Sequence, residues 1–332
     1  MSYFSESLRQ MFGAEPHKPS KEEISAEASE VHLHKKVNPF SRADFEAVYE
    51  THGNGGTKWR NRRWATLIAV NMLFVISYYF DIQILEGALT ASRFVGFHMA
   101  DLNSALQVML AYKHLVLNLV IGTVTVFILW VLLGGRTFCS WVCPYHLISE
   151  WAEKLHLLLA SRNLVTDHSF DRRVRSVLYL VFALLALVSG YTVFETVSPT
   201  GILSRALIYG PGIALIWVGL VLLVEIFYSR RAWCRYVCPI GVTYGVVGTI
   251  SPIRVKYNLR DCHHEGDCRK VCLVPHVLSM TIKGRASEYD MDIGADCTRC
   301  GMCVDICPTD SLNFVVGIGK KSVSKTGVVG ER

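Results

Sequence analysis

The cysteines near the carboxyl end of the chain have the spacing of an iron–sulfur ligand run. The stretch CTRCGMCVDICP carries thiols at Cys297, Cys300, Cys303 and Cys307. In this C-x2-C-x2-C-x3-C-P pattern, three close thiolates bind one cluster and the fourth binds a neighbouring cluster. Structural zinc sites use cysteine pairs at wider separation. The run therefore predicts iron–sulfur clusters and one-electron chemistry.

An incomplete copy of the same run lies upstream, in the stretch CHHEGDCRKVCLVP. Cys262, Cys268 and Cys272 take the first, third and fourth cysteine positions of the pattern. Glu265 stands where the second cysteine belongs, and Leu273 stands where the proline belongs. The upstream run is therefore short of one thiolate.

Because the fourth cysteine of each run crosses over to the other cluster, we expect two unequal sites. A complete [4Fe–4S] cluster is predicted on four thiolates, those of Cys272, Cys297, Cys300 and Cys303. The second cluster is predicted on the three thiolates of Cys262, Cys268 and Cys307, and its fourth corner lacks a cysteine.

Three outcomes are open for that corner. Glu265 ligates iron through oxygen, His263 or His264 ligates through nitrogen, or the corner is empty and a [3Fe–4S] cluster forms. A carboxylate is a harder ligand for this iron than a thiolate, so a three-iron or labile cluster is our first expectation. The plainer alternative is that the upstream run is a remnant and that a single cluster binds.

The remaining four cysteines belong to an internal repeat. The stretch RTFCSWVCP begins at Arg136 and the stretch RAWCRYVCP begins at Arg231, so both copies read R-x-[FW]-C-x-[WY]-V-C-P. The repeat thiols are Cys139, Cys143, Cys234 and Cys238. A spacing of four places both thiols of a copy on one helix face, and the proline that follows favours a bend.

We expect these four thiols to meet, with Arg136 and Arg231 favouring their thiolate forms. Three interpretations compete: a third metal centre holding an iron–sulfur cluster or copper, a pair of redox-active dithiols, and thiols packed as small hydrophobic side chains. The repeat does not identify its ligand.

The elements that must position these residues are apolar. Four long apolar runs cover residues 64–80, 115–133, 174–193 and 211–228. Each has the roughly 17–25 residues that a helix needs to cross a hydrocarbon core. Basic residues gather before the first run, between the second and third, and after the fourth, which predicts cytoplasmic termini. Glu225, inside the fourth run, either accepts protons from a quinol or pairs with the nearby Arg230 and Arg231.

The fold class predicted from these patterns is an α-helical membrane protein with an added α+β domain. Four transmembrane helices form two parallel hairpin repeats within residues 58–252, and a cytoplasmic bacterial-type ferredoxin domain covers residues 253–316. Residues 1–57 are predicted as a mostly disordered cytoplasmic tail, and residues 317–332 as a second tail. The predicted location is the bacterial inner membrane.

The composition of the 332 residues agrees with apolar segments joined to a polar unit. Apolar residues make up 51% of the chain and charged residues 19%, which excludes disorder as the main state. Eleven cysteines, an odd number, argue against a closed set of disulfides.

The composition also bears on the partners. The predicted ferredoxin domain carries a stripe of basic residues with no aromatic side chains on which bases could stack. This stripe is therefore expected to bind an acidic partner or lipid headgroups rather than nucleic acid. Its residues are Arg269, Lys270, Lys283, Arg285 and Arg299. No phosphate loop, dinucleotide fingerprint or catalytic triad is present in the sequence.

The arrangement resembles the NapH/MauN family of membrane ferredoxin-type proteins, and NosR and CcoG share parts of it. The resemblance covers about residues 60–316 and rests mainly on GGRTFCSWVCP, WCRYVCPIG and CTRCGMCVDICP. It implies electron transfer between membrane quinol and a partner redox protein, and other members assist metalloenzyme maturation. Glu265, Leu273 and the long amino-terminal tail depart from the family pattern.

The function predicted from these features is a membrane-bound iron–sulfur electron-transfer subunit. It would relay electrons between the quinone pool or a membrane partner and another redox protein, as a component of a quinol dehydrogenase rather than as a stand-alone enzyme. The alternative is an assembly factor that reduces or holds copper or iron for a metalloenzyme.

Overall fold

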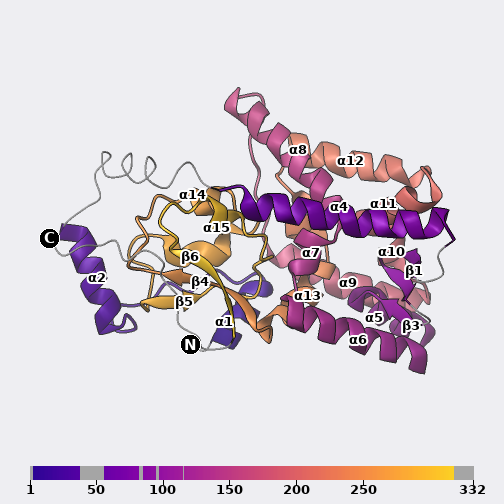
Figure 1. The fold of residues 1–332 in the computed structure, drawn as a ribbon, viewed down its shortest axis with the longest axis horizontal. Coiled ribbons are helices and arrows are strands. Elements are labelled where there is room, and N and C mark those ends of the chain that lie inside the picture. Colours follow the sequence, from indigo (N-terminus) through magenta and orange to yellow (C-terminus); the bar gives the residue numbers. More distant parts are fainter. Residues whose placement is uncertain (1–2, 38–55, 82–84, 95–96, 115, 318–332) are drawn as a thin grey trace.

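The computed structural model describes residues 3–37, 56–81, 85–94, 97–114 and 116–317. Within them, a helical part and a smaller α+β part lie end to end along the long axis of the molecule (Figure 1). The α+β part holds the two ferredoxin-type cysteine runs, and the helical part holds the cysteine repeat.

The helical part has two halves, each containing one copy of the repeat. The first half consists of α4 (Lys58–Tyr79), α5 (Leu102–Tyr112), α6 (Leu117–Leu133), α7 (Thr137–Trp141) and α8 (Pro144–Ser161). The second half consists of α9 (Arg173–Ser189), α10 (Val193–Val197), α11 (Pro199–Tyr209), α12 (Ala214–Phe227), the π-helical turn η1 (Trp233–Val237) and α13 (Ile240–Thr249).

The prediction of four membrane-crossing helices, and with it the multi-pass fold class, is wrong. Among the described residues no helix is both long enough and apolar enough to cross a membrane. Helices α6 and α9 have 17 residues each and α12 has 14, whereas a crossing helix needs about 20 apolar residues. Left-handed glycines, Gly134 and Gly190, end α6 and α9. Helix α4 has 22 residues, but its first two turns are basic.

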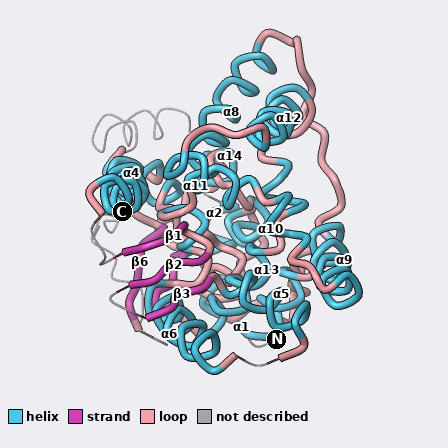
Figure 2. Tube along the Cα trace, turned by 90° about the vertical axis from the view of Figure 1, so that its right-hand side faces the viewer, coloured by secondary structure: helices cyan, strands magenta, loops and turns pink. Residues whose placement is uncertain are grey.

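A three-stranded sheet fills part of the segment between α4 and α5. Strands β1 (Leu85–Ala88), β2 (Ala91–Phe94) and β3 (Phe97–Ala100) pair antiparallel in chain order. The sheet lies beside α6 (Figure 2). Gly122 permits this approach, because a Cβ atom there would stand 1.6 Å from the carbonyl oxygen of His98.

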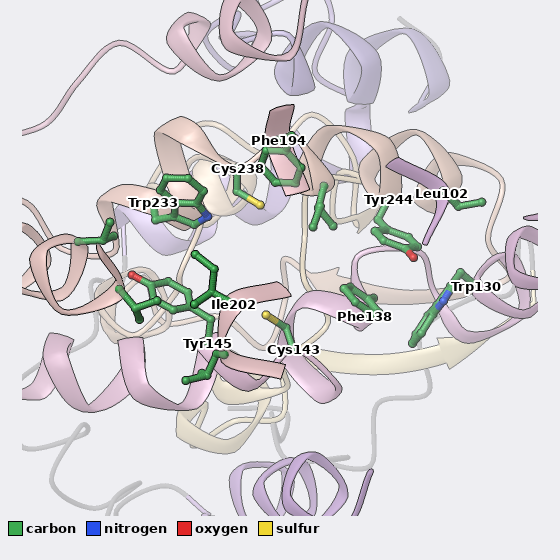
Figure 3. Close-up of a cluster of buried hydrophobic side chains, with 14 of the residues drawn as sticks. Leu102, Trp130, Phe138, Cys143, Tyr145, Phe194, Ile202, Trp233, Cys238 and Tyr244 are labelled. Carbon is green, nitrogen blue, oxygen red and sulfur yellow. The ribbon is translucent and has the colours of Figure 1, made fainter. Parts of the chain in front are cut away.

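An aromatic cluster forms the centre of the helical part (Figure 3). Phe138 stacks on Tyr244 with ring centroids 4.8 Å apart, and Trp130 meets both rings edge-on. Phe138 is the neighbour of Cys139, so this cluster fixes the position of the first repeat copy.

Asp101 caps α5 beneath this cluster and is only 4% exposed. Its carboxylate accepts hydrogen bonds from the backbone N–H groups of Asn103 and Ser104 and from the Tyr244 hydroxyl, the last at 2.6 Å. Burial raises the pKa of Asp101 to about 6, despite these donors. The folded state therefore favours the protonated carboxyl.

We predict that stability contributed by Asp101 is lost as the pH rises. The folded-state pKa lies above the unfolded value, so the contribution is complete near pH 4 and lost through about pH 6, at a cost of about 3 kcal/mol. In Asp101→Asn, an amide can still cap α5 and donate to the Tyr244 oxygen. Melting temperatures between about pH 4 and 7 should therefore fall less in the variant, and equal pH profiles would contradict the prediction.

The α+β part is organised around a central strand. Strand β4 (Ile253–Asn258) pairs antiparallel with β5 (Asp290–Asp292) on one side and with β6 (Leu312–Val316) on the other. The connections hold α14 (Asp267–Lys270), the 3-10 helix η2 (Pro275–Thr281) and α15 (Met302–Ile306). The cysteine runs lie in these connections and next to α14 and α15.

Part of the predicted amino-terminal tail is helical and packed. Helix α1 (Tyr3–Met11) accepts a hydrogen bond from Arg175 at the Met11 carbonyl oxygen, and the Ala295 N–H donates to the Ser7 hydroxyl. Helix α2 (Ala26–Val37) lies against the α+β part (Figure 1). Residues 38–55 and 318–332 of the two predicted tails lie outside the described residues.

Candidate functional site

The structure sorts all eleven cysteines into three cavities. One is lined by Cys272, Cys297, Cys300 and Cys303. A second is lined by Cys262, Cys268 and Cys307. The third is lined by Cys139, Cys143, Cys234 and Cys238. We call them the complete, incomplete and repeat cavities. Every cysteine is a free thiol.

The complete cavity is built by a tight loop that precedes α15. Gly301 has φ +78°, and a Cβ atom there would stand 2.6 Å from the Trp59 side chain. The loop therefore closes against the start of α4. There Asp305 accepts hydrogen bonds from the backbone N–H groups of Trp59 and Arg60, at 3.0 and 2.9 Å. A carboxylate at this helix end is stabilised by the helix dipole.

Arg299 lies inside this loop and not on the surface where the basic stripe placed it. It is 3% exposed, and its guanidinium donates to the carbonyl oxygens of Ile253, Gly248 and Gly134. The predicted stripe therefore loses this member. Lys270 and Lys283 are exposed, and Arg269 and Arg285 are partly exposed.

The incomplete cavity contains polar groups besides its three thiols. His263, His264, Glu265 and Thr281 also line it. The His264 Nδ1 atom lies 2.9 Å from the Thr281 carbonyl oxygen, and the His264 N–H donates to the Cys262 sulfur at 3.4 Å. Burial lowers the pKa of His264, so the ring is neutral.

The repeat cavity joins equivalent residues of the two copies. Cys143 and Cys238 both have extended backbone and each precedes a proline, so a new helix starts where the sequence predicts a bend. Figure 3 shows the two sulfur atoms directed toward the same interior space. Arg136, Tyr145 and His146 also line the cavity.

Arg136 favours the thiolate form of Cys139 and Arg231 that of Cys234, as predicted, but burial outweighs both effects. Burial raises the pKa of Cys143 to about 11 and that of Cys238 to about 12. Burial also raises the pKa of Cys139 and Cys234, and it outweighs the lowering by Arg136 and Arg231. Binding of a metal centre would therefore release protons from these thiols.

The first repeat copy holds the loop of the complete cavity in place. Arg136 donates to the carbonyl oxygen of Asp296 at 2.6 Å, Ser140 to that of Thr298 at 2.7 Å, and Trp141 to that of Arg299 at 3.1 Å. These three donors flank Cys139. The repeat cavity and the complete cavity therefore share one framework.

A buried ion network strengthens this contact. The Asp296 carboxylate accepts from Arg136 at 2.5 Å and from Arg175 at 2.9 Å, and its other oxygen lies 2.9 Å from His276 Nε2. The arginines hold the pKa of Asp296 well below its ordinary value, although burial alone would raise it. Sequence reasoning missed Asp296, although an acidic residue directly before Cys297 was a signal.

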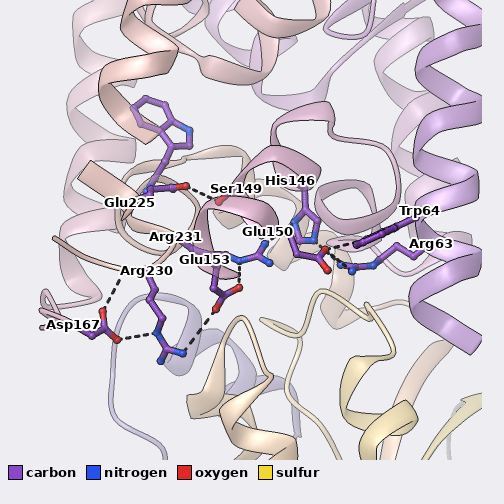
Figure 4. A network of polar contacts seen from close by, with 11 residues as sticks. Arg63, Trp64, His146, Ser149, Glu150, Glu153, Asp167, Glu225, Arg230 and Arg231 are labelled. Carbon is purple, nitrogen blue, oxygen red and sulfur yellow. Dashed lines mark hydrogen bonds and ion pairs between the residues drawn. The ribbon is translucent and has the colours of Figure 1, made fainter. Parts of the chain in front are cut away.

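A second polar network, drawn in Figure 4, includes His146, which lines the repeat cavity. Arg63 donates to Glu150 at 2.5 Å and to His146 Nε2 at 2.7 Å. Arg231 donates to Glu153, also at 2.5 Å. This network joins α4 to α8 and to the second repeat copy, and no sequence pattern predicted it.

Glu225 does not form the predicted ion pair with a nearby arginine, and its role as a proton acceptor from quinol stays a prediction. It accepts hydrogen bonds from the Ser149 hydroxyl at 2.6 Å and from the Trp233 N–H at 3.1 Å. The arginines that we predicted as partners bind elsewhere, Arg230 to Asp167 and Arg231 to Glu153. Glu225 therefore fixes the start of η1 beside Cys234.

The donor sets of the three cavities are of the kind that iron–sulfur clusters use. In the described part of the chain, no three His, Cys, Asp or Glu side chains are placed to hold one ion. A cluster distributes its thiolate ligands over several iron atoms, and each cavity offers three or four thiols.

Comparison with known proteins points to the same chemistry. A family described as "4Fe-4S binding domain" matches residues 115–163 and again residues 210–258, and a second family with that description matches residues 295–313. The first two matches contain one repeat copy each, which agrees with an internal duplication.

Several known proteins are similar to this chain over most of its length. The methylamine utilization ferredoxin-type protein MauN of Paracoccus denitrificans is 34% identical over 72% of this chain and 84% of its own length. The ferredoxin-type protein NapH of Escherichia coli is 31% identical over 76% of this chain and 89% of its own length. NapH of Haemophilus influenzae is also 31% identical, over 77% and 88%. No solved structure matches the chain significantly.

Proposed function

The chain belongs to the family of NapH and MauN ferredoxin-type proteins, iron–sulfur proteins of electron transfer, and from this premise we propose that it relays electrons through three metal centres. The observation that carries the proposal is the grouping of all eleven cysteines into three cavities. When bound, iron–sulfur clusters accept and release single electrons at potentials set by the surrounding protein.

We propose ligands for each centre. A [4Fe–4S] cluster is held in the complete cavity by Cys272, Cys297, Cys300 and Cys303. A second cluster is held in the incomplete cavity by Cys262, Cys268 and Cys307. A third centre is held in the repeat cavity by Cys139, Cys143, Cys234 and Cys238, and the family matches at residues 115–163 and 210–258 favour an iron–sulfur cluster there.

The order of the cavities supports a linear relay. Leu273 lines the repeat cavity and its neighbour Cys272 lines the complete cavity, so two consecutive residues connect them. Helix α15 connects the complete cavity to the incomplete one, because Cys303 and Cys307 lie at its two ends. The complete cavity is therefore the middle member.

We propose that electrons enter at the repeat end, from quinol, and leave at the incomplete cavity to another redox protein. The exposed cations Lys270 and Lys283 near that cavity would favour an acidic partner. We also propose that lipid of the bacterial inner membrane contacts the helical part. Apolar side chains there are strongly exposed, including Leu117 at 71%, Val188 at 84% and Ile213 at 88%.

The test is anaerobic reduction of the full-length protein, reconstituted with iron and sulfide, by a short-chain quinol analogue. We expect bleaching of the cluster absorbance and EPR signals that grow in together. A preparation reduced by dithionite but unaffected by quinol would overturn the quinol donor.

The same preparation tests the assembly-factor alternative. That role predicts stoichiometric binding of copper(I), lost in the Cys139→Ser/Cys234→Ser double variant, together with no response to quinol. Under our proposal the double variant instead loses iron from the repeat cavity and keeps the EPR signal of the complete cavity.

Lys35 of α2 provides a further prediction about the second centre. Its ammonium donates to the carbonyl oxygens of Leu259 and Cys262, which brings a positive charge to a ligand of the incomplete cavity. A cation stabilises the more negative, reduced form of a cluster. We expect Lys35→Met to lower the midpoint potential of that centre by about 59 mV, a tenfold shift for one electron. Lys36→Met, on the exposed side of α2, should leave the potential unchanged in the same EPR titration.

A further inference from the structure

His264 lines the incomplete cavity, and one of its ring nitrogens has no hydrogen-bond partner. The His264 Nδ1 atom lies 2.9 Å from the Thr281 carbonyl oxygen, which only accepts, so Nδ1 carries the ring proton. The Nε2 atom then has a free lone pair. It is buried and has no hydrogen-bond partner in the structure. An imidazole whose Nδ1 donates to a carbonyl while Nε2 stays available is the usual arrangement of a metal-binding histidine.

The backbone holds this ring beside the thiols. His264 has φ +61°, a left-handed conformation that a residue other than glycine rarely adopts. In this conformation its N–H donates to the Cys262 sulfur, and its ring lines the same cavity as Cys268 and Cys307. The carbonyl of Thr281, from η2, then fixes the ring from the other side.

From these contacts we infer that His264 Nε2 is the fourth ligand of the cluster held by Cys262, Cys268 and Cys307, an inference that rests on the proposed second centre. Imidazole suits iron better than the harder carboxylate of Glu265 does. Histidine ligation of an iron–sulfur cluster is established chemistry in Rieske centres, where it raises the reduction potential. This assignment replaces our expectation of an empty corner.

Ligation by His264 changes the net charge of the cluster. A neutral imidazole in place of a thiolate leaves the cluster one unit less negative. The centre of the incomplete cavity should therefore be reduced at a more positive potential than the all-cysteine centre of the complete cavity. Poising the protein between the two potentials then gives the EPR signal of this centre without that of the complete cavity.

The experiment is pulsed EPR on full-length protein, reconstituted with iron and sulfide and labelled with ¹⁵N-histidine. We expect one nitrogen strongly coupled to the centre of the incomplete cavity. Its coupling should change when ¹⁴N-histidine is replaced by ¹⁵N-histidine. The coupling is absent in His264→Gln and present in the matched neighbours His263→Gln and Glu265→Gln. His264→Cys should keep the iron content and lower the reduction potential by at least about 59 mV, which is a tenfold change in the equilibrium constant for one electron.

Several outcomes would overturn the inference. They are a nitrogen coupling that survives His264→Gln, a coupling absent from the parent protein, and a three-iron signal in anaerobic parent protein. Loss of the second centre on Glu265→Gln alone would assign the corner to the carboxylate. An iron count for a single cluster in the α+β part would reject both this ligand and the proposed second centre. A missing quinol response with an intact coupling would reject the proposed donor alone.

Discussion

Asp296→Ala is expected to lose about 3–5 kcal/mol of unfolding free energy, because it leaves two buried guanidinium groups without their carboxylate. Asp296, Arg136 and Arg175 are 1–3% exposed, so the two guanidinium groups are shielded from bulk water. His276 loses its contact with the same carboxylate. Chemical denaturation of the full chain measures the effect.

The effect should extend to the cysteine loop. Arg136 also donates to the Asp296 carbonyl, so movement of its unpaired guanidinium displaces the residue before Cys297. We therefore expect Asp296→Asn, which preserves side-chain volume, to lower iron retention in the complete cavity as well as stability. Asp267→Asn is the matched control, because Asp267 pairs with the exposed Lys270 and a surface pair contributes little. Equal denaturation midpoints for Asp296→Asn and the parent would contradict the prediction.

The chemistry of the chain could be predicted from its sequence because ligand spacing is a local property. The run CTRCGMCVDICP and the repeat R-x-[FW]-C-x-[WY]-V-C-P determine which thiols are near one another in the chain. Membership of the NapH/MauN family, predicted from these stretches, is confirmed by relatives at 29–34% identity. The assignment of particular thiols to particular clusters stays a prediction.

The error in the fold class came from treating apolar runs as uninterrupted helices. Left-handed glycines end α6 at Leu133 and α9 at Ser189, and α12 has only 14 residues, and hydropathy averages do not detect such helix ends. The amino-terminal helices were missed for a related reason. Their few apolar residues, such as Met11 and Ala28, are buried against distant segments, and charge content alone suggested disorder.

The polar networks could not be predicted because they join residues far apart in sequence. Arg63 meets His146 and Glu150, and Arg136 meets Asp296, only after the chain has folded. A single sequence marks these residues as charged but does not pair them. The corner assigned to His264 depends likewise on a contact with Thr281, from a separate helix.

The crossover of the fourth cysteines gives the prediction with the largest spectroscopic effect. Cys272→Ser alters the upstream run, yet we expect it to remove the cluster of the downstream run, because Cys272 lines the cavity with Cys297, Cys300 and Cys303. Cys307→Ser should do the reverse, because Cys307 lines the cavity with Cys262 and Cys268.

The two variants are matched controls for each other, since each replaces the fourth cysteine of a run with serine. In reconstituted full-length protein, Cys272→Ser should lose the EPR signal of the more negative centre and about four iron atoms, the content of one cubane. Cys307→Ser should keep that signal and lose the more positive one. The opposite result would mean that each run binds its own cluster, and the cavity pairing of Cys272 with the downstream thiols would then have no role in ligation.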